Sequence, residues 1–226
     1  MNTQNITEYI RRGVGLRFTR RRIKLTALVC APIILVVLYI GALEDGFMQG
    51  FGVFATVTYL LSAICAYILL RKNSADKYKL LASPCVYYDM MLMFSSLVLL
   101  FAKKFCISTV SVIFLIIPAF IVPPILMLVH SVMFRTSKNV YRRKISIVLI
   151  PVSAGITGIG AIGRLIFYFM YDEYKNELTQ EQMGLLLLCG CLLVIYLLST
   201  ALLDIQRYFY FTRLEKAGLI TEEHIK

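Results

Sequence analysis

Six apolar stretches, each about 20 residues or longer, constrain the fold of this chain more than any other feature. A helix needs ~20 apolar residues to cross the ~30 Å hydrocarbon core of a bilayer. Hydrophobic residues make up 59% of the sequence and charged residues 16%, whereas soluble domains average ~25% charged residues. The sequence therefore predicts an all-α integral membrane protein with six transmembrane helices in one bundle. The stretches cover residues 25–43, 49–70, 80–102, 106–133, 145–171 and 183–204.

The segments outside these stretches divide the chain into three parts. We expect a basic, amphipathic cytoplasmic arm over residues 1–24, a transmembrane domain over 25–204 and a cytoplasmic helical tail over 205–226. A cleavable signal peptide is the competing interpretation of the first stretch. It fits poorly, because a polar region of 24 residues precedes a stretch that is long enough to span. In the tail, Gly218 is the expected C-cap of a continued sixth helix.

The positions of Lys and Arg predict the orientation in the membrane. Twenty of the 24 basic residues lie in the arm, the tail and the second and fourth connections, and only three lie in the opposite connections. Because cytoplasmic loops are enriched in Lys and Arg, both termini are expected in the cytoplasm of a multi-pass plasma-membrane protein. The longest connection on the other side is acidic, with Asp172, Glu173, Glu177 and Glu181.

The net charge of +11 would suggest nucleic-acid binding in a soluble protein. Here the cations flank the spans, so we expect the lipid bilayer, with anionic lipid at the basic cytoplasmic face, and no nucleic acid. In the arm, Ile6, Ile10, Val14 and Phe18 recur at steps of four and make an apolar stripe on a helix. Such a helix can lie on an anionic leaflet. The alternative is a simple positive-inside anchor.

The six Cys and two His show no metal-ligand spacing. There is no C-x-x-C pair, and Cys189 and Cys191 point to opposite sides of a helix, so we expect no disulfide framework, metal site or bound cofactor. His130, at a span end, is expected to be an interface residue. Asp204 and Arg207, three residues apart at the end of the sixth stretch, are expected to form an ion pair.

Asp89 is the strongest candidate for a functional group. It lies nine residues into the third stretch, ~13 Å deep at 1.5 Å per residue. An ionisable group at that depth is expensive and indicates function by default. Asp89, with Tyr88 beside it and Ser96 on the same helix face, is expected to bind a proton, a cation or a substrate amine. The alternative is a neutral carboxylic acid that holds helices together.

Arg164 is the second candidate, nearer the outer surface of the fifth stretch. It shares a helix face with Thr157 and Gly160, and this small, polar stripe favours a buried wall. Arg164 is expected to bind an anionic ligand group or, alternatively, to extend outward and pair with Asp172. The run from Gly158 to Gly163 matches G-x-G-x-x-G, but it lies inside an apolar span, so it indicates close helix packing and not dinucleotide binding. The expected packing residues are Ala154, Gly158, Gly160 and Ala161.

Three prolines lie within seven residues of the fourth stretch: Pro118, Pro123 and Pro124. Proline removes a backbone donor and clashes with the carbonyl one turn back, so we expect a kinked or broken helix. A break at that depth must be buried in protein or line a wet cavity, and such breaks occur in transporters. The alternative is a kink that packing absorbs.

No hydrolase motif or matched pair of carboxylates is present, so an enzyme is disfavoured. No ATP-binding motif is present either. The function that we expect is a small solute-binding or transport-associated membrane subunit, with another membrane protein or a separate ATPase as partner. The alternative is a regulatory, immunity or assembly protein that acts through helix–helix contacts.

Overall fold

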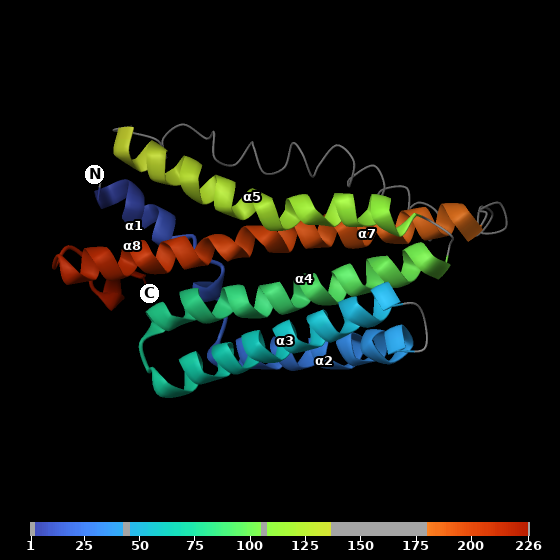
Figure 1. Cartoon of the computed structure of the whole chain (residues 1–226). Helices are drawn as coiled ribbons and strands as arrows, with labels where there is room; N and C mark the ends of the chain where they lie inside the picture. Colours follow the sequence, from blue (N-terminus) through green and yellow to red (C-terminus); the bar gives the residue numbers. More distant parts are fainter. Residues whose placement is uncertain (1–2, 43–45, 105–107, 137–179, 226) are drawn as a thin grey trace, which may run out of the picture.

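The computed structural model describes residues 3–42, 46–104, 108–136 and 180–225, and all regular structure within these ranges is helical (Figure 1). Five helices are long and apolar enough to cross a membrane, and they coincide with the first four predicted stretches and the sixth. A multi-pass membrane protein is therefore confirmed. The main helices are α2 (Arg20–Ala42), α3 (Gly46–Lys72), α4 (Lys79–Lys104), α5 (Thr109–Thr136) and α7 (Gln180–Ser199).

The fifth predicted stretch lies outside the described residues. Arg164 and Thr157 lie there too, as do the predicted packing residues Ala154, Gly158, Gly160 and Ala161. The short elements are α1 (Thr3–Arg11), η1 (Gly15–Arg17), η2 (Asp76–Tyr78), η4 (Thr200–Leu203), α8 (Asp204–Lys216) and η5 (Glu222–Ile225).

The last predicted span continues as a helix into the tail, as the sequence pattern predicts. After α7, one tight helical turn, η4, leads directly into α8, so the helical segment runs on to Lys216. Gly218 follows in the left-handed conformation, with φ of 69°, and the Leu219 N–H donates to the Leu214 carbonyl at 3.0 Å. This is the helix-ending geometry that glycine favours: Gly218 ends the helix as expected, one residue after the C-cap Ala217.

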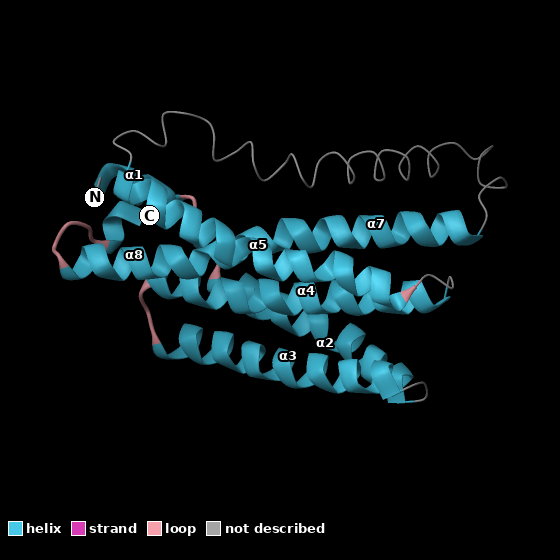
Figure 2. Ribbon diagram, turned by 45° about the horizontal axis from the view of Figure 1, so that its top comes forward, coloured by secondary structure: helices cyan, strands magenta, loops and turns pink. Residues whose placement is uncertain are grey.

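The helix α4 occupies the centre of the bundle. It lies between the α2–α3 pair on one side and α7 on the other, while α5 packs against both α7 and α4 (Figures 1 and 2). In the apolar segment of α4, 56% is buried inside the protein, whereas 22–33% is buried in the apolar segments of the other four spans. Because protein surrounds α4, it can carry buried polar side chains that lipid would exclude. They are Ser83, Asp89, Ser95 and Ser96.

The outer helices expose long apolar side chains. Their outward faces suit contact with lipid chains, where a soluble protein would carry charge. Examples are Leu28, Val29 and Tyr39 on α2, Phe54, Leu61 and Ile64 on α3, and Phe114, Leu128 and Val132 on α5.

The fourth predicted span, expected to be kinked or broken at its prolines, is one continuous, bent helix. The helix α5 continues through Pro118, Pro123 and Pro124, and Figure 1 shows that its ribbon bends and does not separate. Each proline removes one backbone hydrogen bond but has a φ that a helix accepts, and a neighbouring helix can satisfy freed groups. The hydroxyl of Tyr196 on α7 donates to the carbonyl of Leu115 at 2.9 Å and so joins α7 to α5.

Candidate functional site

Asp89 lies in the middle of α4 and is fully buried. It is ten residues after the start of α4, and Ser62 is ten residues before the end of α3, so both lie ~15 Å from the same end of the bundle. The Ser62 hydroxyl donates to Oδ1 of Asp89, and it also lies 3.2 Å from the carbonyl of Cys85. One carboxylate oxygen is thus bound across the α3–α4 interface.

The second oxygen, Oδ2, has no hydrogen-bond partner in the part of the chain that the structure describes. Cys30 from α2 and Tyr59 from α3 are buried in a core cluster against which Tyr88 and Met90, the residues on either side of Asp89, pack. The Tyr59 hydroxyl donates to the Ala27 carbonyl at 3.1 Å and not to Asp89. An unsatisfied polar atom in a buried site is costly, so Oδ2 is free to take a further ligand or to carry a proton.

Two residues predicted to accompany Asp89 do not join it. The ring of Tyr88 packs edge-on against Phe120 of α5, with 6.0 Å between the ring centres. The hydroxyl of Ser96 donates to the Leu92 carbonyl of its own helix at 2.8 Å. Ser62, Cys30 and Tyr59 are the neighbours that the sequence analysis missed. Ser62 carries no sequence signal of its own, and only the antiparallel pairing of α3 with α4 places it opposite Asp89.

A second buried cluster is centred on Asp204, which is fully buried at the start of α8. Its Oδ1 accepts the Val14 N–H at 3.1 Å, and its Oδ2 accepts the Gly15 N–H at 2.7 Å and the Ser83 hydroxyl at 2.8 Å. Arg207 donates to Oδ1 at 2.5 Å, which confirms the predicted pair. The pair is buried and joins the N-terminal segment (residues 3–18), α4 and α8.

Arg207 and Gln206 hold Tyr9 of α1 from two sides. The Arg207 Nε donates to the Tyr9 carbonyl at 3.1 Å, and its guanidinium lies 4.6 Å from the centre of the Tyr9 ring. The Tyr9 hydroxyl donates to Gln206 at 2.8 Å. Gln206 in turn donates to the Met127 carbonyl of α5 at 2.7 Å, so one network links α1, α5 and α8. The ring of His130 packs edge-on against Tyr9.

The N-terminal segment is folded onto the bundle and does not form one amphipathic helix. Ile6 and Ile10 are fully buried with Phe211 of α8, so the apolar stripe faces protein. The helix α1 ends at Arg11, and Val14 and Phe18 flank the separate turn η1. Gly13 and Gly15, on either side of Val14, disfavour helix and permit close approach to α4 and α8.

Arg20, which the sequence analysis counted only as a topology signal, has a structural role. Its guanidinium donates to the carbonyls of Leu70, Asn73, Ser74 and Ala75, where α3 ends, and it lies 3.7 Å from Asp76. Carbonyls at a helix C-terminus lack intrahelical partners, so a cation there stabilises the end of the helix.

Within the described ranges, no three His, Cys, Asp or Glu side chains come together as a metal site would require. No protein-family model matches the chain, and no significant match is found among the curated proteins or the solved structures.

Proposed function

We propose that this chain is a membrane subunit that acts in transport, and that Asp89 is the group that binds the transported proton, small cation or amine. The supporting observation is the fully buried carboxylate in the middle of the central helix, with Oδ2 unpartnered among the described residues. Ionisable groups inside spans mark ion pathways and proton relays in many membrane proteins. Without an ATP-binding motif of its own, the subunit takes energy from a gradient or from a separate ATPase.

The surroundings of Asp89 suit a positively charged ligand. A bare carboxylate there lacks hydration, and the hydroxyl of Ser62 compensates only one of its two oxygens. A proton or cation on Oδ2 removes the remaining cost, because it neutralises the charge.

The substitution Asp89→Asn is expected to abolish transport while the protein still folds, because Asn keeps the shape but binds no proton or cation. The full chain is reconstituted into vesicles, and the flux of protons, Na⁺ and methylammonium is followed down an imposed gradient. We expect flux in wild-type vesicles, and a fall to the level of empty vesicles for the variant. The matched control is Asp76→Asn, a carboxylate at the end of the bundle that is expected to leave flux unchanged.

A second function, helix–helix assembly with another membrane protein, is favoured by one observation. The Ser62–Asp89 bond crosses between two helices, as a structural contact would. In that case wild-type vesicles show no flux, and Asp89→Asn lowers the amount of folded protein. Mass spectrometry of what co-purifies with the full chain in native lipid discs separates the two roles. An ATPase or permease partner supports transport, and absence of flux with a different membrane partner overturns it.

We also propose that the chain has six spans in the plasma membrane with both termini in the cytoplasm. Three of the basic segments support this, because α1, the α3–α4 connection and α8 lie at one end of the bundle (Figure 1). Lys77 of that connection pairs with Glu215 of α8 at 2.7 Å. Charges gathered at one end agree with a single cytoplasmic face.

Reporter fusions test this topology and the fifth span together. Alkaline phosphatase, which is active only outside the cytoplasm, is fused after Lys138, Lys175 or Lys216. We expect activity only for the fusion after Lys175, because residues 145–171 would carry the chain to the outer face. A fluorescent protein on the C-terminus serves as the complementary reporter. Inactive phosphatase after Lys175, or activity after Lys216, would contradict the six-span arrangement.

A further inference from the structure

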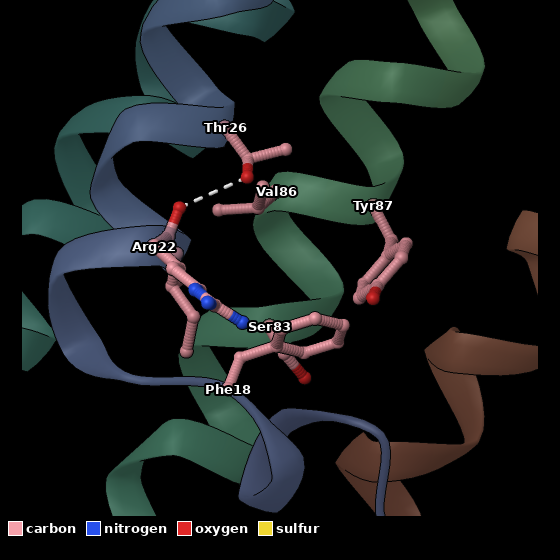
Figure 3. A pocket seen from close by; sticks show the side chains of 7 residues that line it. Phe18, Arg22, Thr26, Ser83, Val86 and Tyr87 are labelled. Atoms are coloured by element: carbon pink, nitrogen blue, oxygen red, sulfur yellow. Dashed lines mark hydrogen bonds between the residues drawn. The ribbon is translucent and has the colours of Figure 1, made fainter.

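A small hollow lies between the first turn of α2 and the adjacent part of α4, beside η1 (Figure 3). Its cavity volume is about 40 Å³, enough for more than one water molecule. Apolar groups dominate its wall, with polar atoms at only a few points. The residues that line it include Phe18, Arg22, Thr26, Ser83, Val86 and Tyr87.

Two side chains from different helices point their hydrogen-bond donors toward this hollow. Figure 3 shows the side chain of Arg22 from α2 and that of Tyr87 from α4 pointing into the same region, above the ring of Phe18. Within the described residues, neither the guanidinium of Arg22 nor the hydroxyl of Tyr87 has an ion-pair or hydrogen-bond partner. The neighbouring Arg20 is different, because carbonyls at the end of α3 bind it.

The hollow lies where the polar headgroups of a bilayer would lie. Arg22 is in the first turn of a 23-residue helix whose next turns expose Leu25, Leu28 and Val29. A cation at a span end, followed along the helix by lipid-facing apolar side chains, matches a phospholipid in both charge and polarity. A free phosphate would match only the cation.

We propose that this hollow binds the phosphate of an anionic phospholipid from the leaflet at this end of the bundle. Arg22 contacts the phosphate as a charged donor, and the Tyr87 hydroxyl gives a second hydrogen bond. The acyl chains run along the exposed face of α2 past Leu25 and Val29. This inference is independent of any ligand on Asp89.

The wall of the hollow is held in place before a lipid arrives. Ser83 on the α4 side donates to the buried carboxylate of Asp204 at 2.8 Å. On the α2 side, the Thr26 hydroxyl donates to the Arg22 carbonyl at 2.9 Å, which leaves its oxygen able to accept (Figure 3). A site that is already ordered loses little entropy on binding, so a small contact area can still be selective.

The test titrates the detergent-purified full chain with phosphatidylglycerol, or with phosphatidylcholine, and counts retained lipids by native mass spectrometry. We expect one phosphatidylglycerol to be retained in preference to phosphatidylcholine. Arg22→Gln should weaken this retention about fivefold, the effect of about 1 kcal/mol per basic residue at a lipid surface. The matched control is Arg21→Gln, which removes the same charge from an exposed neighbour outside the hollow and should change retention less than twofold.

Two further variants test the hollow itself. Thr26→Phe fills it and keeps every charge, so retention of phosphatidylglycerol should fall; Tyr87→Phe removes one hydroxyl without changing the volume and should weaken retention about twofold. Size-exclusion profiles and helical circular dichroism show whether each variant is folded. Equal losses for the Arg21 and Arg22 variants, full retention in Thr26→Phe, or displacement of the lipid by inorganic phosphate would each overturn the proposal.

Discussion

Replacing Asp204 with alanine is expected to destabilise the protein by about 3–5 kcal/mol, the usual cost of removing one partner from a buried ion pair. The carboxylate accepts four donors, from Val14, Gly15, Ser83 and Arg207. Alanine leaves all four without that acceptor, and Arg207, whose side chain is only 10% exposed, keeps an uncompensated charge. We expect the N-terminal segment to leave the bundle before the spans unfold.

The stability of Asp204→Ala is measured by thermal unfolding of the purified full chain in one detergent. Asp204→Asn should be intermediate, because its amide oxygen still accepts a hydrogen bond but carries no charge. The control is Glu8→Ala, which removes an exposed carboxylate paired with Arg12 at 3.2 Å. Such surface pairs contribute less than ~1 kcal/mol. Similar losses for the Asp204 and Glu8 variants would rule out a central role for the Asp204 network.

Gly15→Ala is expected to detach the N-terminal segment for a steric reason. A Cβ on Gly15 would lie 2.5 Å from the Lys79 carbonyl oxygen and 2.5 Å from Oγ of Ser83. A backbone atom cannot move aside as the end of a flexible side chain can. The segment must therefore shift, which lengthens the bond of 2.7 Å from the Gly15 N–H to Asp204. We expect a loss of about 1–3 kcal/mol, as for other overpacked sites.

Limited trypsin digestion measures this detachment, because the segment carries Arg11, Arg12 and Arg17. Cleavage after these residues should be faster in Gly15→Ala than in the wild type. Gly50→Ala is the control: no atom lies within 4 Å of the Cβ it would add, and alanine is the better helix former. If digestion of both variants matches the wild type, the close contact of Gly15 with α4 is not needed for docking.

The spans were predictable because the bilayer imposes a minimum apolar length that few other structures need. The position of Asp89 at mid-depth followed from counting residues along one stretch. The pairing of Asp89 with Ser62 could not be predicted in this way, because a serine in an apolar stretch has no pattern of its own. Only the antiparallel register of α3 and α4 places Ser62 opposite Asp89.

The role of the N-terminal segment was less accessible from the sequence. A stripe of Ile6 and Ile10 among arginines indicates an amphipathic helix, but the pattern is the same whether lipid or protein covers it. The covering residue Phe211 lies about 200 positions away in the chain. Asp204 and Arg207 were predicted as a local pair from their spacing, whereas the bonds of Asp204 to Val14 and Gly15 depend on tertiary packing.

The bond between Gly15 and Asp204 joins residues 189 positions apart, and this separation sets an order of events during synthesis. The acceptor of this bond is made 189 residues after its donor. At ~5–20 residues per second, the N-terminal segment waits on the order of 10–40 s after its own translation for α8 to emerge. Throughout that interval Ile6, Tyr9 and Ile10 lack the surface that covers them in the finished protein. The N-terminal segment thus docks only after α8 has been made, and a chain that stops before α8 leaves this segment undocked.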